Sequence, residues 1–343
     1  MPFHPLRALR DLLHARTLYY NFLHTQSLVL RSSSGVACMR GAAAFCVSLA
    51  ALPSSLGYLA AAGVIRSAQL RAGRVHRCGT SMASSAQCQL QIEQFPCLSD
   101  NYGFLVHDAA SGQTAAIDTP DAKAYLDALD RRGWKLTHIL NTHHHHDHAG
   151  GNMELKAATG CKIVGPVNEK NRIPGLDVAV GGGDTVQVGR LNATVLDVGG
   201  HTIGHVAYHF GDAGVAFVGD SLFAMGCGRM FEGSYPQMFA SIERLAALPD
   251  DTAIYCAHEY TAANAKFALS VDGSNAALRA RSLEVQQARQ RGEPTVPTLM
   301  KLERETNPFL RYHSADIRKV LGVASDAPAV EAFAAIRKAK DKF

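Results

Sequence analysis

The stretch Asn141-Thr142-His143-His144-His145-His146-Asp147-His148-Ala149-Gly150-Gly151 carries the most information about the fold of this 343-residue chain. It follows an apolar run, Leu136–Leu140, that is typical of a buried strand. Four consecutive histidines can also be a cloning tag or a solvated loop, but tags lie at chain termini and this run is internal. A closed structural zinc site is a further alternative, although such sites normally use cysteine and none is near.

The spacing within this stretch suggests a metal site. If the backbone stays extended past Thr142, side chains two positions apart lie on the same side. That would group His143, His145 and Asp147, and a turn after Asp147 would bring His148 in from another direction. The other two histidines of the run should point away. Three imidazoles and one carboxylate can bind a first-row metal ion through nitrogen and oxygen.

Three more ionisable side chains each follow a predicted strand: His201, Asp220 and His258, after Ala193–Val198, Val215–Val218 and Ala253–Cys256. Taken singly, a His or Asp at a strand end is more often a cap or a surface residue. In a sandwich of sheets, however, such loops gather on one rim. Together with the histidine loop they would supply five histidines and two aspartates.

These motifs resemble the metallo-β-lactamase-fold hydrolases, and within them the hydroxyacylglutathione hydrolases (glyoxalase II). The resemblance rests on four segments: THHHHDHAGGN (142–152), GHTIGH (200–205), GDSLFAMGCG (219–228) and AHEYTAANAKF (257–267). It extends from about residue 88 to the C-terminus. It implies an α/β fold, a four-layer αβ/βα sandwich, with a catalytic domain at 88–257 and a helical substrate-binding domain at 258–343.

The resemblance also implies a dinuclear metal centre. One divalent ion would take His143, His145 and His201; the second would take Asp147, His148 and His258; and Asp220 would bridge them. Zinc is the usual metal in this family, with iron or manganese as alternatives. The chain contains no G-x-S-x-G motif, so a covalent serine route has no candidate.

The implied reaction is hydrolysis of S-(2-hydroxyacyl)glutathione, typically S-D-lactoylglutathione, to glutathione and D-lactate, as in methylglyoxal detoxification. A hydroxide held between the two metal ions would attack the thioester carbonyl. Asp147 and Asp220 are the predicted catalytic residues, Asp147 because it could also accept the proton of the attacking water. The partner is therefore a small glutathione thioester.

Substrate-binding residues follow from the same resemblance: Arg229, Tyr260, Asn264, Arg337 and Lys340. Arg337 and Lys340 are three apart on a predicted helix and should face one way. The alternative for this pair is a solvated basic helix end that favours the helix dipole. Phe231 stands where the family often has tyrosine, so one hydroxyl contact is lost.

Other functions remain open. A mononuclear-iron persulfide dioxygenase of the same fold would need only one metal position. A non-catalytic metal-binding module would bind metal without turnover. A phosphodiesterase or lactonase is disfavoured by Tyr260, Arg337 and Lys340.

Residues 1–81 differ in composition from the rest of the chain. They contain nine arginines, no lysine and one acid, Asp11. Such composition is typical of an organelle transit peptide, which would place the protein in the mitochondrion or another organelle. An untranslated extension with translation starting near Met82 would leave it in the cytoplasm, and a membrane anchor is a third alternative, although the apolar tract at 41–65 is a poor span.

The charge and the cysteines exclude several classes of protein. The net charge of +4 is uneven: the first 81 residues carry +8 and the remainder carries −4, so no nucleic-acid binding and no stable membrane association are expected. None of the eight cysteines forms a C-x-x-C pair, which argues against a zinc ribbon and against a disulfide framework. Buried thiols are expected instead.

The remaining pattern predicts short strands and helices in alternation. Strands are expected near 90–95, 102–107, 114–118, 134–140, 162–164, 185–188 and 206–210. Helices are expected at 121–132, 151–158 and 237–248, and in the Ala-rich segments 261–270, 276–291 and 327–340.

Overall fold

The computed structural model describes residues 90–343, so the expectations for residues 1–81 lie outside the described part of the chain. Its strands are β1 (Leu90–Cys97), β2 (Asn101–Asp108), β3 (Gln113–Ile117), β4 (Lys135–Leu140), β5 (Lys162–Pro166), β6 (Val178–Val180), β7 (Thr185–Val188), β8 (Leu191–Asp197), β9 (Val206–Phe210), β10 (Val215–Gly219), β11 (Leu222–Phe223), β12 (Gly226–Cys227), β13 (Ala253–Cys256) and β14 (Thr298–Leu299). Its α-helices are α2 (Ala122–Arg132), α3 (His146–Ala149), α4 (Asn152–Thr159), α5 (Tyr235–Ala246), α6 (Thr261–Asp272), α7 (Ala276–Gln290), α8 (Met300–Thr306), α9 (Ala315–Leu321) and α10 (Ala329–Lys342).

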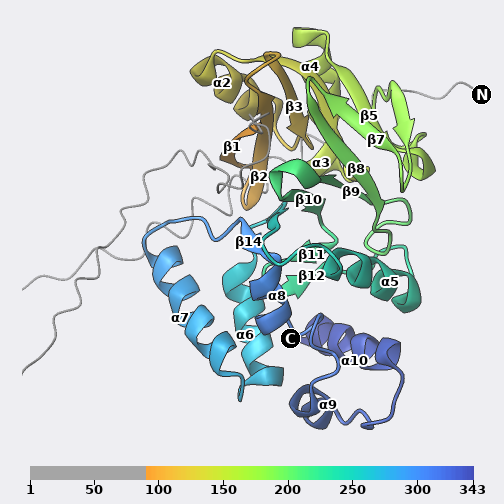
Figure 1. The fold of residues 1–343 in the computed structure, drawn as a ribbon, viewed down its shortest axis with the longest axis vertical. Coiled ribbons are helices and arrows are strands. Elements are labelled where there is room, and N and C mark those ends of the chain that lie inside the picture. Colours follow the sequence, from red (N-terminus) through yellow and green to blue (C-terminus); the bar gives the residue numbers. More distant parts are fainter. Residues whose placement is uncertain (1–89) are drawn as a thin grey trace, which may run out of the picture. The chain divides into compact units, whose positions relative to one another are not determined.

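Two sheets form the framework of the described residues (Figure 1). The first has the order β1-β2-β3-β4-β5-β6, antiparallel through β3 and parallel from there on. The second has the order β14-β13-β10-β9-β8-β7, and its β10–β13 pair is parallel. Because parallel strands end at the same edge of a sheet, the loops that follow β4, β10 and β13 can meet.

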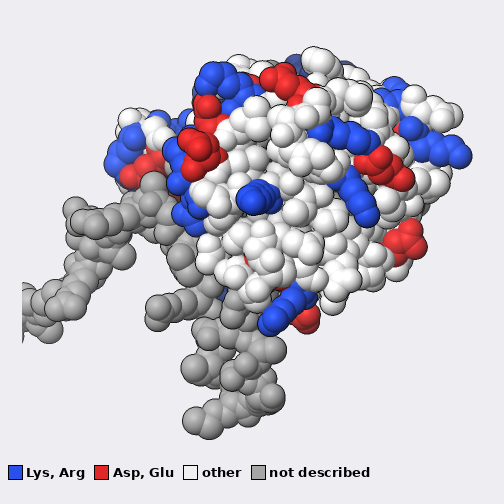
Figure 2. Space-filling model, turned by 90° about the horizontal axis from the view of Figure 1, so that it is seen from above, with Lys and Arg blue, Asp and Glu red and all other residues white. Residues whose placement is uncertain are grey.

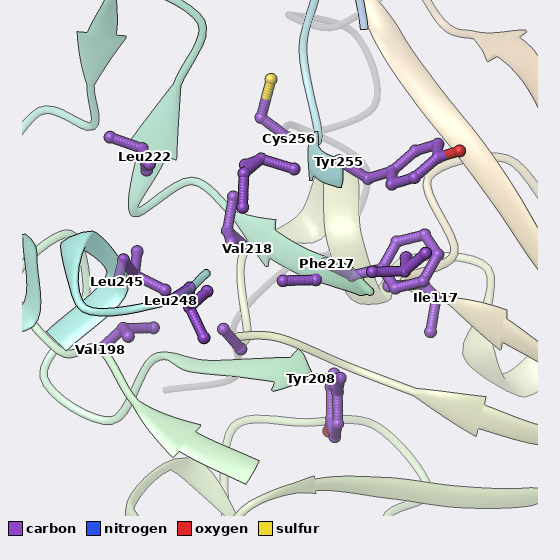
Figure 3. Close-up of a cluster of buried hydrophobic side chains, with 14 of the residues drawn as sticks. Ile117, Val198, Tyr208, Phe217, Val218, Leu222, Leu245, Leu248, Tyr255 and Cys256 are labelled. Carbon is purple, nitrogen blue, oxygen red and sulfur yellow. The ribbon is translucent and has the colours of Figure 1, made fainter. Parts of the chain in front are cut away.

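The predicted sandwich is confirmed by how the layers pack. Apolar side chains of both sheets form one core, in which Phe104 of β2 contacts Phe217 and Tyr255 at ring-centre distances of 5.4 and 5.5 Å. On the other side of the second sheet, Leu245 of α5 packs with Val198 and its neighbours (Figure 3). A separate cluster joins α2 and α4 to the first sheet. The order is therefore helices, sheet, sheet, helices.

Capping residues explain the bounds of α2, the helix that connects the parallel strands β3 and β4. Asp121 accepts a hydrogen bond from the N–H of Ala124, a standard N-cap, and Gly133 ends the helix in the left-handed conformation at φ 65°. Tyr125 is fully buried and its hydroxyl donates to the Ile117 carbonyl of β3 at 2.8 Å. This contact fixes α2 against β3, the strand that ends beside the 143–148 loop.

The C-terminal part of the chain is largely helical, as expected, and α6 to α10 gather together in Figure 1. The sequence pattern did not predict the short elements β6, β11, β12, β14, α3, α8 and α9. Strand β14 matters most, because it pairs antiparallel with β13 and returns the segment after residue 258 to the second sheet. The segment 258–343 is therefore not helical throughout.

Two further expectations concern the described residues. Cys97, Cys161, Cys227 and Cys256 are free and buried, as predicted. Within residues 90–343, none of the helices has the length and apolar character needed to cross a membrane.

Candidate metal centre

The seven predicted ligand residues converge although they come from four distant segments. The histidine loop follows β4, His201 lies between β8 and β9, Asp220 follows β10, and His258 follows β13. Main-chain bonds join these segments, because Val206 donates to the Thr142 carbonyl at 2.9 Å and Ala257 donates to the Gly219 carbonyl at 3.2 Å.

Glycine is required where β10 ends. Gly219 has φ 50°, and a Cβ there would lie 2.6 Å from Thr142 Oγ1 and 2.7 Å from His205 Cε1. The close approach brings the following residue, Asp220, against the histidine loop.

One detail of the predicted loop is wrong. The backbone turns before Asp147, not after it, because helix α3 begins at His146. Extended geometry ends at His145, whose φ and ψ are −56° and 148°. The grouping nevertheless survives, since the helical turn presents Asp147 and His148 together on the side of Asp220 and His258.

The first donor set consists of His143, His145 and His201. Nδ1 of His145 lies 3.0 Å from Nε2 of His143 and 3.1 Å from Nε2 of His201. Three imidazole nitrogens pointing at one another would repel through their lone pairs, so this geometry favours a shared cation.

The second donor set consists of Asp147, His148 and His258, and Asp220 lies between the two sets. Asp220 Oδ2 is 3.4 Å from Nε2 of His201, whereas Asp220 Oδ1 is 3.4 Å from Nε2 of both His148 and His258. Asp147 Oδ2 is 3.6 and 3.5 Å from the same two nitrogens. Each oxygen of Asp220 therefore faces a different set, as a bridging carboxylate would.

Unsatisfied polar atoms support a metal at this point. Nε2 of His148 and Oδ1 of Asp220 are buried without any hydrogen-bond partner. Such atoms cost free energy unless an ion or a hydrogen bond satisfies them. The donor set of five imidazoles and two carboxylates is one that divalent first-row metals accept, so the residues fit metal ions.

Neighbouring groups fix the ring orientation of four ligands through their Nδ1 atoms. His148 faces Asp118 Oδ2 at 2.9 Å, His258 faces Asp100 Oδ1 at 2.8 Å, and His201 donates to the Arg229 carbonyl at 2.7 Å. The Nδ1 atom of His143 faces the hydroxyl of Thr142 at 3.0 Å. These contacts leave Nε2 as the atom that faces the centre, and they are typical of metal-binding histidines.

The protonation states also suit metal binding. Burial lowers the pKa of His145 to about 4, and burial holds the pKa of His143 well below its usual range, so both are neutral. Burial opposes ionisation of Asp220, but the nearby His148 and His258 keep its pKa below the usual range. Burial lowers and Asp220 raises the pKa of His148, to about 9. A metal ion would displace that proton.

Sequence reasoning missed several supporting residues. Asp118, at a strained φ of 55° after β3, accepts from the N–H and hydroxyl of Thr142 and contacts His148. His205 is fully buried, stacks on His143 at 4.6 Å, and accepts the N–H of Asp220. The second His of GHTIGH was the available signal for His205, but Asp118 carries no motif of its own.

A pocket of about 370 Å³ opens onto the metal-binding side chains. It is lined by His145, Asp147, His201, Asp220, Phe231, His258 and Tyr260. Tyr260 stacks on His258 at 4.7 Å, and Phe231 packs edge-on against His145 and His201. The two aromatic rings therefore form apolar walls beside the donor atoms.

Of the five predicted substrate contacts, only Tyr260 lines this pocket. Arg229 is exposed beside Asp341, and Lys340 is half-buried over the rings of Phe267 and Phe343. Arg337 is 4% exposed, and its guanidinium donates to the Cys227 carbonyl at 2.9 Å and pairs with Asp341.

Asn264 is also buried, and its amide donates to the Ala224 carbonyl at 3.1 Å. Its side chain, like that of Arg337, therefore holds the backbone of the β11–β12 hairpin, which follows Asp220. Glu303 and Asn307 bind the same hairpin: Glu303 accepts the N–H of Met225 at 2.8 Å, and Asn307 donates to the Gly226 carbonyl at 2.9 Å.

Comparisons with known proteins agree with this geometry. The family model for the metallo-beta-lactamase superfamily matches residues 105–258, and that for the hydroxyacylglutathione hydrolase C-terminus matches residues 259–343. A hydroxyacylglutathione hydrolase from Erythrobacter litoralis is 57% identical over 254 residues, covering 74% of this chain and all of that protein. One from Hyphomonas neptunium is 52% identical over 254 residues, covering 74% of this chain and 98% of that protein.

Among solved structures, ETHE1 from Myxococcus xanthus aligns with a TM-score of 0.51 at 27% identity, covering 72% of this chain and 96% of that one. A metallo-beta-lactamase from Staphylococcus aureus aligns with a TM-score of 0.50 at 24% identity, covering 74% and 71%. The second likeness concerns the fold alone. With the matched families and the identities to curated relatives, the chain belongs to the hydroxyacylglutathione hydrolase family.

Proposed function

We propose that this protein hydrolyses S-(2-hydroxyacyl)glutathione thioesters, typically S-D-lactoylglutathione, to glutathione and a 2-hydroxy acid. The observation that carries the proposal is the pair of donor sets joined by Asp220, at the base of the pocket. Family membership supports the substrate class, because the relatives named above are hydroxyacylglutathione hydrolases.

Each donor set would hold one divalent ion: His143, His145 and His201 the first, and Asp147, His148 and His258 the second. Zinc is our proposal for both positions. Bound there, zinc would bring the pKa of a water molecule to about 7 and polarise the thioester carbonyl.

The side chains of this protein perform the remaining tasks. Asp147 is 41% exposed at its side chain, and its Oδ2 accepts from the Asn101 amide at 3.2 Å, which leaves it able to accept a proton from water in the pocket. Tyr260 and Phe231 flank the donor atoms and give the pocket two apolar walls. A thiolate leaves without a strong general acid, so the absence of a further acid among the pocket-lining residues is consistent with a thioester.

The competing persulfide dioxygenase function needs a single iron position. The complete second set, Asp147, His148 and His258, argues against it, since a one-metal enzyme would not require those donors within 4.8 Å of one another.

The test compares two reactions on the same purified protein. Loss of thioester absorbance with S-D-lactoylglutathione, without oxygen uptake on glutathione persulfide, is the expected result. Neighbouring histidines provide the matched control: His145→Ala should abolish turnover, whereas the exposed His146→Ala should leave it intact. Oxygen uptake without thioester loss would reject the proposal.

A further inference from the structure

Glu169 is a buried carboxylate outside the metal ligands. It ends the short 3₁₀ helix η1 (Val167–Glu169) that follows β5, and it is only 2% exposed. A buried carboxylate is expensive unless hydrogen bonds compensate for lost solvation. Its partners therefore indicate why the residue is there.

The two oxygens of Glu169 bind two different loops. Oε2 accepts the main-chain N–H of His144 at 2.8 Å and contacts Nδ1 of the same ring at 2.6 Å. Oε1 accepts the hydroxyl of Thr202 at 2.5 Å and the N–H of Gly204 at 2.9 Å. One side chain thus joins the loop after β4 to the loop between β8 and β9.

The second loop is built to allow this approach. A Cβ at Gly204 would lie 2.7 Å from Cγ of Glu169 and 2.8 Å from Cβ of Asn168. Any larger residue would push the carboxylate away from the loop. The close packing and the four hydrogen bonds are independent observations of the same link.

These contacts could also be read as a third metal position, because His144, Glu169 and Glu232 place donor atoms within 4.8 Å of one another. However, each oxygen of Glu169 is already engaged twice, and Glu232 pairs with Arg172 at 2.6 Å. The cluster is therefore a link between loops.

We propose that Glu169 is a positioning residue that sets the spacing of the first donor set. His144 lies between ligands His143 and His145, and Thr202 directly follows ligand His201, so the link spans the three nitrogens. The ligands of the second donor set have other partners: Asn101 binds Asp147, Asp118 contacts His148, and Asp100 contacts His258. The effect of Glu169 is thus selective for one of two metal positions. The inference rests on the proposed metal centre.

Glu232 makes a weaker version of the same link nearer the surface. It accepts the N–H of Ile203 at 3.1 Å and lies 3.8 Å from Nε2 of His144, and its side chain is 20% exposed. Solvent screens such contacts. Glu232→Gln is therefore a matched control on the same two loops.

The experiment uses Glu169→Gln, which keeps the shape of the side chain. It replaces one carboxylate oxygen by an NH2 group, which would face the hydrogen-bond donors of either the loop after β4 or the loop between β8 and β9. Outer-shell partners typically contribute 10- to 100-fold in metal affinity. We expect one of the two zinc ions to be released at a 10- to 100-fold lower chelator concentration, while the second is retained. Cobalt substitution should show altered absorption of one ion only. Glu232→Gln should shift release less than threefold.

A second buried carboxylate distinguishes the positioning role of Glu169 from a general loss of buried charge. Asp272 is 1% exposed and pairs with Arg311 far along the chain, so Asp272→Asn should leave the release of both zinc ions unchanged. If Glu169→Gln fails to fold, Thr202→Val removes one bond and should lower affinity about tenfold. Unchanged zinc release in folded Glu169→Gln, or in Thr202→Val, overturns the inference. Wild-type protein that binds two zinc ions but cleaves no thioester overturns only the proposed function.

Discussion

The metal-binding loops and the C-terminal helices contribute polar side chains in different ways. In the loops, all seven predicted ligands converge, with donor atoms aimed at shared points. In the C-terminal region, two of the predicted substrate contacts, Asn264 and Arg337, are instead buried against main-chain carbonyls of the β11–β12 hairpin.

The two regions differ in how far the surroundings of a side chain are set by its own neighbours in the sequence. Most ligands in the loops occur within a few residues of strand ends, so the strand direction largely positions them, and the short helix α3 presents Asp147 and His148. A helix residue has many possible partners, and its role depends on which segment packs over it. Side chains of the C-terminal helices hold the hairpin that follows Asp220, whereas the pocket is lined by Tyr260, directly before α6, and by no residue of α6 to α10.

The largest expected effect is at the point where the two donor sets meet. Asp220→Ala should remove metal from both positions and lower kcat/KM about a thousandfold, since metal ions contribute several kcal/mol to such reactions. Metal analysis and thioester assays measure both quantities. Asp212→Ala, at an exposed position in the short 3₁₀ helix Gly211–Ala213, is the control. Unchanged metal stoichiometry would contradict the bridging role.

The second largest expected effect is on stability, when the buried ion pair that supports the β11–β12 hairpin is broken. Glu303 is fully buried and pairs with Arg281 at 2.5 Å. Glu303→Ala leaves that cation unpaired, so we expect the free energy of unfolding to fall by about 3–5 kcal/mol in urea titrations. Glu305→Ala, exposed on the same helix, should change it by less than about 0.5 kcal/mol.

Arg337 and Lys340 lie three residues apart on α10, but we expect Arg337 to have a structural role and Lys340 to contact the substrate. Arg337→Ala should destabilise the fold by about 1–3 kcal/mol because it leaves buried carbonyls without donors. Lys340→Ala should instead raise KM for the glutathione thioester roughly tenfold with little effect on stability. The reverse pattern would show that Arg337 is the substrate contact. Metal content should be unchanged in both variants.

The smallest expected effect is at the pocket wall. Phe231→Tyr adds a hydroxyl beside the donor atoms and restores the residue often found in the family. A new hydrogen bond contributes about 0.5–1.5 kcal/mol, so KM should fall about threefold with kcat unchanged. Steady-state kinetics measure the change, and an unaltered KM would mean that the hydroxyl contacts no part of the substrate.

Much of the framework followed from sequence pattern. The apolar runs predicted β7, β9 and β13 with their observed bounds. Strands β11, β12 and β14, each of two residues, were missed because so short a segment carries no periodicity. The turn before Asp147 was missed because a four-residue helix inside a histidine run has no separate signal. Supports such as Asp118 and Glu169 depend on long-range packing, which no local pattern records.

The surface of the described residues carries charges of both signs. On the face in Figure 2, lysines and arginines stand among aspartates and glutamates. The expectation of no nucleic-acid partner stays a prediction.

Both donor sets combine residues from segments that are far apart in the sequence, so they cannot form early in synthesis of the chain. Every three-ligand group of the centre includes His201, Asp220 or His258 as well as residues of the 143–148 loop. A nascent chain therefore contains no complete three-ligand group before His201 has been synthesised, and the second donor set is complete only at His258. Because each group joins the loop after β4 of the first sheet to a loop of the second sheet, both metal positions require the two sheets to be packed together.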